Sequence, residues 1–148
     1  MVNVPFAEHT KKMLFRERYR IPSARLKNWD YTTPGYYFVT ICTKDKHCWL
    51  GDIRGIQEEP WASLQPSEAG KVVASCWEKI PEHYKNVALD QHIIMPNHFH
   101  GILSIEKQDP AVPLGLIVNQ FKAASTKHIR GAGHHDFAWQ ARFYDHII

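Results

Sequence analysis

The sequence predicts an α+β fold in which an antiparallel β-sheet carries its helices on one face. Three observations support this prediction. The elements follow in the order strand, strand, helix, strand, strand, helix, and the connections are short enough for hairpins. Both helical segments have a single apolar stripe. With 148 residues, 44% of them hydrophobic and 22% charged, the chain has the size and composition of one globular domain with a core.

The first half of the sheet is predicted from composition and turn signals. Residues 36–43, aromatic and β-branched almost throughout, form the strongest predicted strand. A turn at 32–35 precedes it, and a turn at 44–46 follows. The remaining assignments are an edge strand at 24–31, a returning strand at 48–53 and a loop at 54–66.

Two helices are predicted from periodicity and boundary residues. Ser67 is the expected N-cap of the first helix, and Pro81 ends its pattern. Its apolar stripe consists of Ala69, Val72, Val73, Cys76, Trp77 and Ile80. The second helix is expected at 114–129, before a Gly-Ala-Gly segment. Its apolar face consists of Leu114, Ile117, Val118, Phe121 and Ala124.

A central hairpin carries the candidate site. Residues 87–95 form its first strand, Pro96 and Asn97 turn the chain, and the second strand continues to residue 105. Side chains alternate along a strand, so His98 and His100 share one face, about 7 Å apart, while Phe99 packs on the other. An incomplete shell of two imidazoles is suited to a catalytic metal that takes a third ligand from elsewhere. The alternative is that both are ordinary strand residues.

Charge and cysteine content bear on partners and compartment. The net charge is +3, and residues 11–27 contain seven Lys or Arg against the single acid Glu17. This arm is interpreted either as a phosphate-contacting segment or as a solvated leader. No apolar run is long enough to span a bilayer, and the start lacks the apolar centre of a signal peptide. Three cysteines without CxxC spacing favour reduced thiols in a cytoplasmic protein.

The loop and the tail after the second helix carry no assigned chemistry. His134, His135 and Asp136 lie in a Gly-flanked segment and are interpreted as solvated loop residues. Residues 139–148 are dense in aromatics and end on two isoleucines.

With these segments in place, the chain resembles the single-tyrosine HUH transposases, and more closely the REP-associated tyrosine transposase branch. The resemblance runs from Arg25 to the last residue. Its most specific block is Met-Pro-Asn-His-Phe-His-Gly at 95–101. The other matching segments are 25–31, 35–43, 67–70, 120–127 and 139–146.

The resemblance implies a ferredoxin- or RRM-like HUH nuclease core that nicks and rejoins single-stranded DNA beside hairpins. His98 and His100 match the family's histidines, which hold a divalent metal over the scissile phosphate. A tyrosine attacks the phosphorus and stores the bond as a 5′-phosphotyrosine. Imidazole ligands alone favour zinc, whereas the resemblance implies Mg²⁺ or Mn²⁺.

The sequence departs from the family after the last matching segment. In the relatives the nucleophilic tyrosine lies on a further helix, which also supplies a metal ligand, and this sequence ends before it. Tyr144 matches a different family position and is the fallback nucleophile. The predicted organisation is a basic arm at 1–23 and a C-terminally truncated HUH transposase-like domain at 24–148. Apolar surface left uncovered would favour a homodimer.

Three functions follow as hypotheses. The first is transposase-like nicking and religation at hairpin-bearing DNA. The second is a catalytically inactive module that only binds structured single-stranded DNA, and the third is an unrelated metallohydrolase that activates water. The predicted DNA contacts are Lys11, Lys12, Arg16, Arg18, Arg20, Arg25, Lys27, Lys122, Lys127, Arg130 and Arg142.

Overall fold

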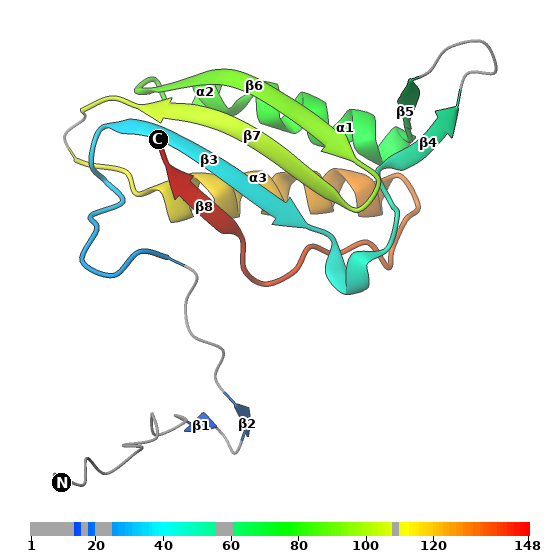
Figure 1. Cartoon of the computed structure of the whole chain (residues 1–148), viewed down its shortest axis with the longest axis horizontal. Helices are drawn as coiled ribbons and strands as arrows, with labels where there is room; N and C mark the ends of the chain where they lie inside the picture. The colour runs from blue at the N-terminus through cyan, green and yellow to red at the C-terminus, as the bar shows by residue number, and fades with distance from the viewer. Residues whose placement is uncertain (1–13, 16–17, 20–24, 56–60, 108–109) are drawn as a thin grey trace, which may run out of the picture.

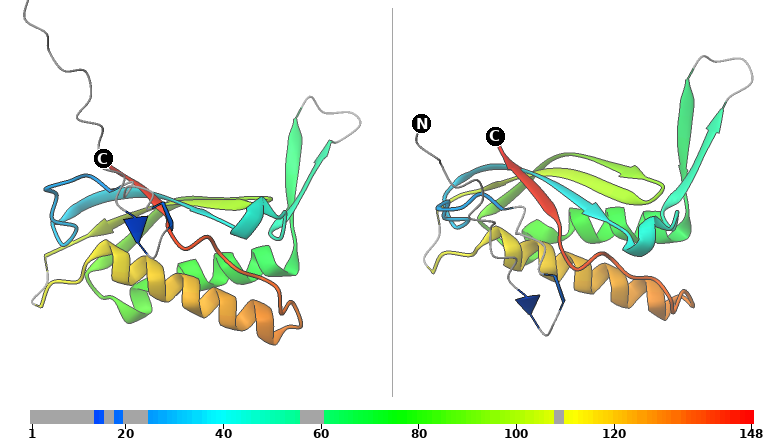
Figure 2. Two further views of the ribbon diagram at one scale, coloured as in Figure 1. Left: turned by 90° about the horizontal axis from the view of Figure 1, so that it is seen from below. Right: turned by 60° about the horizontal axis from the view of Figure 1, so that its bottom comes forward.

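A computed structural model describes residues 25–55, 61–107 and 110–148, together with the backbone of two short strands, β1 (Leu14–Phe15) and β2 (Arg18–Tyr19). A four-stranded antiparallel sheet in the order β6-β7-β3-β8 lies over the helices, which all cover one of its faces (Figures 1 and 2). The sheet strands are β3 (Gly35–Cys42), β6 (Val87–Met95), β7 (His98–Ile105) and β8 (Tyr144–Ile147). The helices are α1 (Glu68–Glu78), α2 (Ile80–His83) and α3 (Leu114–Gly131), with a 3-10 turn, η1, at Lys44–Lys46. The predicted fold class is confirmed.

Strict alternation along the two central strands separates the two faces of the sheet. In β3, Tyr37, Val39 and Ile41 are completely buried, and in β7 Phe99 and Leu103 are buried in the same layer. These side chains pack against the helices, so the residues between them face the side without helices. The predicted open face is therefore present.

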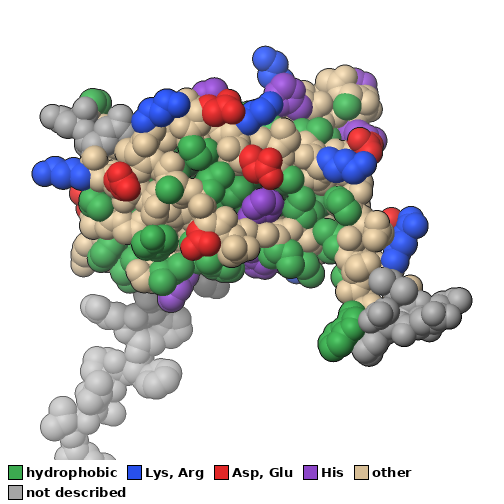
Figure 3. Space-filling model, turned by 90° about the horizontal axis from the view of Figure 1, so that it is seen from above, with side chains coloured by type: hydrophobic (Ala, Val, Ile, Leu, Met, Phe, Trp, Pro, Cys, Tyr) green, Lys and Arg blue, Asp and Glu red, His purple; other side chains and the backbone are tan. Residues whose placement is uncertain are grey.

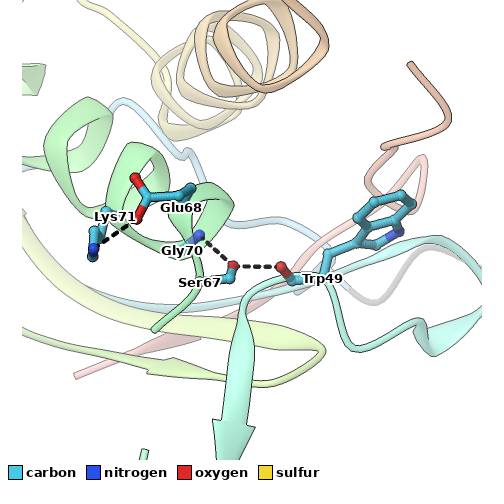
Figure 4. A network of polar contacts seen from close by, with 5 residues as sticks. All are labelled: Trp49, Ser67, Glu68, Gly70 and Lys71. Atoms are coloured by element: carbon cyan, nitrogen blue, oxygen red, sulfur yellow. Dashed lines mark hydrogen bonds and ion pairs between the residues drawn. The ribbon is translucent and has the colours of Figure 1, made fainter. Parts of the chain in front are cut away.

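Helix α1 begins at the predicted cap. The Ser67 hydroxyl accepts a hydrogen bond from the Gly70 amide (3.1 Å) and donates one to the Trp49 carbonyl (2.6 Å), as Figure 4 shows. One turn along, Glu68 and Lys71 form an exposed ion pair. Ser67 thus satisfies an open helix amide and also ties the helix start to the segment before β4.

Helix α3 confirms the second predicted helix with one correction. Ala124 is exposed, and Ser125 is buried in the apolar face instead. The Ser125 hydroxyl donates to the Phe121 carbonyl (2.9 Å) and accepts from Trp139 Nε1 (3.0 Å). A hydroxyl that both donates and accepts a hydrogen bond can be buried at little cost in free energy. A prediction of the buried face from apolar residues therefore missed Ser125.

The predicted edge strand at 24–31 is wrong. Residues 25–34 form bends and turns, with Asn28 in the left-handed region (φ 66°). Asp30 Oδ1 accepts from the Thr32 amide (2.9 Å), a local bond that competes with strand pairing.

The predicted return of residues 48–53 along β3 is also wrong. The predicted loop at 54–66 is wrong at 54–55 and 62–66, which are strand residues, whereas 56–60 lie outside the described residues. Strand β4 (Gly51–Gly55) pairs with β5 (Ala62–Pro66), and the two project from the body as a separate arm. Both edges of β3 are already occupied, by β7 on one side and by β8 on the other. The aromatic tail, which the sequence left unassigned, supplies β8.

The predicted basic arm at 1–23 lies outside the described residues except for the backbone pairing of β1 with β2. Among the described helices, none is both long and apolar enough to cross a membrane.

Candidate functional site

The candidate site begins at the turn between β6 and β7. The Leu50 amide donates to the Pro96 carbonyl (2.9 Å), and the Thr43 amide donates to the Asn97 carbonyl (2.9 Å). The end of β3 and the root of the β4–β5 arm therefore hold the turn from outside the hairpin. This anchoring fixes the backbone from which His98 projects.

The structure brings the two predicted histidines together on the open face. His98 and His100 are both half-buried, and their ring centroids lie 4.7 Å apart at an interplanar angle of 79°. The rings are closer than the strand rise alone predicts, because they lean toward each other.

Asn97 orients the His98 ring. Its Nδ2 faces the Lys46 carbonyl (3.4 Å), so its Oδ1 is the atom that lies 2.7 Å from His98 Nδ1. An amide oxygen only accepts, and so His98 Nδ1 carries the proton. The lone pair of His98 is then on Nε2, the nitrogen available to a metal.

Two residues of β3 orient the His100 ring. Thr40 Oγ1 lies 2.8 Å from His100 Nδ1, and Phe38 stacks on the ring with centroids 5.2 Å apart at 22°. With the hydroxyl accepting from Nδ1–H, His100 also presents Nε2. Asn97, Thr40 and Phe38 were not among the site residues predicted from the sequence. Asn97 had a signal, its place directly before the first histidine, whereas the β3 residues are found only through strand pairing.

Burial lowers the pKa of both imidazoles, which favours the neutral form that binds a metal. It lowers the pKa of His98, and burial together with the neighbouring His98 lowers the pKa of His100. Both rings are therefore neutral at neutral pH, the state in which imidazole binds a metal. Their chemistry fits a divalent cation as two of its ligands.

No third His, Cys, Asp or Glu joins the pair within the described ranges. Cys42 is opposite His98 in the pairing of β3 with β7, but burial raises the pKa of its thiol. A protonated thiol is a poor metal ligand. The part of the chain that the structure describes thus supplies two imidazoles, and water or substrate oxygens can complete the shell.

Tyr144 shares the face of the histidines. It is opposite Thr40 in the pairing of β8 with β3, and Thr40 is opposite His100, so the three residues form one row across the sheet. Two strand spacings separate the Tyr144 and His100 backbones, about 10 Å. The tyrosine side chain is 56% exposed.

The predicted DNA contacts are dispersed. Lys11, Lys12, Arg16 and Arg20 lie outside the described residues, and Arg18 is described only in its backbone. The Arg25 guanidinium packs over the Tyr31 ring (5.3 Å) and the Phe143 ring (4.8 Å). Lys27 and Arg142 are exposed. Lys122, Lys127 and Arg130 line a groove beside α3.

The chain was compared with known proteins in sequence and in fold. No family model matches the chain. An uncharacterized protein of Haemophilus influenzae is 35% identical over 145 residues, which cover 85% of this chain and 77% of that protein.

Two solved structures are similar in fold. A REP-associated tyrosine transposase bound to a REP hairpin superposes with a TM-score of 0.53 at 15% identity, over 86% of this chain. This chain covers 62% of the length of that transposase. A predicted transposase of Deinococcus radiodurans superposes with a TM-score of 0.53 at 17% identity. The superposition covers 84% of this chain and 86% of the Deinococcus radiodurans protein. The fold is therefore transposase-like.

Proposed function

The chain belongs to one family with the uncharacterized Haemophilus influenzae protein, and we propose that it is a transposase-like protein that nicks and rejoins single-stranded DNA. The observation that carries this proposal is the oriented histidine pair. On the uncovered face of a transposase-like sheet, His98 and His100 lie side by side, and Asn97 and Thr40 contact Nδ1 of the two rings, which leaves Nε2 of each ring for a metal.

The proposed cofactor is a divalent metal, Mg²⁺ or Mn²⁺, held by His98 and His100. When bound, it supplies positive charge against the negative charge that develops on a phosphodiester under attack. The protein's own part is to keep both imidazoles neutral and fixed, so that little reorganisation is needed when substrate binds.

Tyr144 is the proposed nucleophile within this chain. Its phenol would lose its proton as the oxygen forms a bond to phosphorus, the bond from phosphorus to the 3′ oxygen would break, and the leaving 3′ oxygen would take up a proton to become a 3′ hydroxyl. Attack by the 3′ hydroxyl on the phosphotyrosine reverses the reaction. The position of Tyr144 in the same row as His100 supports this role, because a phosphate lying over Thr40 would face both side chains.

The proposed substrate is single-stranded DNA that carries a hairpin. The similar transposase structure is bound to a REP hairpin, and the fold it shares with this chain supports the same class of partner. The homodimer stays a prediction.

A second candidate function is binding of such DNA without cleavage. The open face supports it independently of the metal, since Tyr36 and Tyr144 are more than half exposed there and half-buried Phe38 stacks on His100 between them. Exposed rings on a sheet surface can stack unpaired bases.

One experiment separates the candidates. The purified chain is incubated with a fluorescent hairpin-bearing single strand and Mn²⁺, and the products are resolved on a denaturing gel. We compare wild type with the double variant His98→Asn/His100→Asn and with Tyr144→Phe. The matched controls on the same face are His146→Asn and Tyr36→Phe, both exposed.

The proposal expects a covalent protein–DNA adduct that the histidine double variant and Tyr144→Phe abolish and both controls retain. An adduct that survives Tyr144→Phe would contradict the assigned nucleophile. Binding without any cleavage would support the second candidate. Cleavage without an adduct would instead indicate a metallohydrolase that uses water.

A further inference from the structure

A groove of about 450 Å³ runs between α3 and the segment 138–141 that leads to β8. The views in Figure 2 show this segment returning alongside α3 toward the sheet. Lys127, Arg130 and Thr126 line the helix side of the groove, and Ala138 and Ala141 line the other side. Trp139 and Gln140 line the same side as these two alanines.

The groove has one sign of charge. None of the residues that line the groove is Asp or Glu, and Lys127 and Arg130 are exposed in it. The nearest acid along the chain is Asp136, just before the segment that forms the other wall. The edge of the molecule over β6 and α1 differs, because acidic and basic side chains are mixed there (Figure 3). A strip of uniform positive charge is the surface that a phosphate backbone prefers.

Two of the three cations that line the groove, Arg130 and Lys122, are held by hydrogen bonds. Arg130 Nε donates to the Phe137 carbonyl (2.9 Å), which fixes the exposed guanidinium beside the wall of the groove. Lys122 has a different role. Its Nζ donates to the Gln140 carbonyl (2.7 Å) and lies 3.3 Å from the Ala141 carbonyl, so it fastens the wall of the groove.

The wall of the groove is tied to the edge of the sheet near the histidine pair. The Gln140 amide donates to the Cys42 carbonyl (2.8 Å), and Cys42 is opposite His98. Two strand spacings, about 10 Å, therefore separate the His98 backbone from the segment that forms the wall of the groove. The histidines lie on the face without helices and the groove lies beside α3, so a DNA strand that passes His98 reaches the groove by turning around this edge of the sheet.

We propose that the groove binds the phosphodiester backbone of the same DNA strand whose reacting phosphate lies at His98 and His100. Lys127, Arg130 and the Thr126 hydroxyl contact the phosphates, and Lys122 is a positioning residue for the wall. This inference rests on the proposed function, because it assigns a second contact region to the same substrate. The contacts are to the backbone, so binding through the groove is independent of sequence.

The test measures affinity for a fluorescent single strand by anisotropy between 50 and 200 mM salt. The variant is Lys127→Glu/Arg130→Glu, and the charge-matched control is Lys79→Glu/Lys85→Glu, which changes two exposed lysines at and after the end of α1. Loss of two backbone contacts should weaken binding roughly tenfold and reduce the slope of log K against log salt by about 1.4, at about 0.7 for each contact of a single strand. The control should change neither the affinity by more than about twofold nor the slope.

Equal effects of the two double variants would overturn the proposal, since they would indicate only long-range charge. An unchanged affinity in the groove variant would also overturn it. Neither result would bear on Mn²⁺ binding by His98 and His100, which we expect the groove variant to retain, so failure of the groove is distinguishable from failure of the proposed function. Competition by an RNA strand of the same sequence, if stronger than by the DNA strand, would overturn the assignment to DNA.

Discussion

Gly101 lies directly beneath the indole ring of Trp77. A Cβ atom added at Gly101 would be 2.4 Å from Trp77 Cζ2 and 2.9 Å from Phe99 Cε1. The Trp77 and Phe99 rings in turn lie 4.8 Å apart, centroid to centroid. The absence of a side chain after His100 thus lets α1 approach the sheet closely behind the histidine pair, and packing on one face supports the site on the other.

Gly101→Ala should destabilise the protein by about 1–3 kcal/mol, because the methyl group has to displace a buried ring system. The free energy of unfolding from urea denaturation measures this. Gly131→Ala is the matched control, since a Cβ at that position meets nothing within 4 Å and the helical backbone there accepts alanine. Equal stability of Gly101→Ala and wild type would contradict the close packing of α1 on β7.

Ser67→Ala should cost about 1 kcal/mol of unfolding free energy. It removes the acceptor of the Gly70 amide and the donor to the Trp49 carbonyl, so both groups lose a partner. Ser75→Ala, at an exposed position in the middle of α1, is the control and should be neutral or slightly stabilising. The same urea titration applies, and a cost at Ser75 as large as at Ser67 would refute the capping role.

Asn97→Ala should lower Mn²⁺ affinity about 10- to 100-fold, the usual effect of losing a group that orients a metal-bound histidine. The reason is that His98 loses the acceptor that fixes its tautomer. Isothermal titration calorimetry gives the affinity, and circular dichroism checks that the fold is retained. Asn119→Ala, exposed on α3, should bind the metal as wild type does.

The three cysteines should differ in reactivity toward iodoacetamide at pH 8. Burial raises the pKa of Cys42 and of Cys76, so each has less of the reactive thiolate at that pH than an ordinary cysteine. Cys48 is exposed and should be alkylated first, followed slowly by the other two. Peptide mass spectrometry at timed intervals gives the order, and early labelling of Cys76 would contradict its burial against α3.

The sequence by itself determined the elements whose signal is local. Alternation in residues 36–43 and 98–105, the 3.6-residue stripe of both helices and the Ser67 cap each depend on neighbours along the chain. The face shared by His98 and His100 follows from the same alternation. These features were predicted correctly because backbone geometry alone relates the residues concerned.

Only the tertiary structure decided the features that depend on residues far apart in the chain. The tail forms β8 because β3 has a free edge, and β4 is thereby left to pair with β5. The pairing of β3 with β7 also brings Thr40 and Phe38 to His100, which orients the ring. Competition for a strand edge and contacts across a sheet depend on chain segments that lie more than a hundred residues apart in β3 and β8, so no local periodicity encodes them.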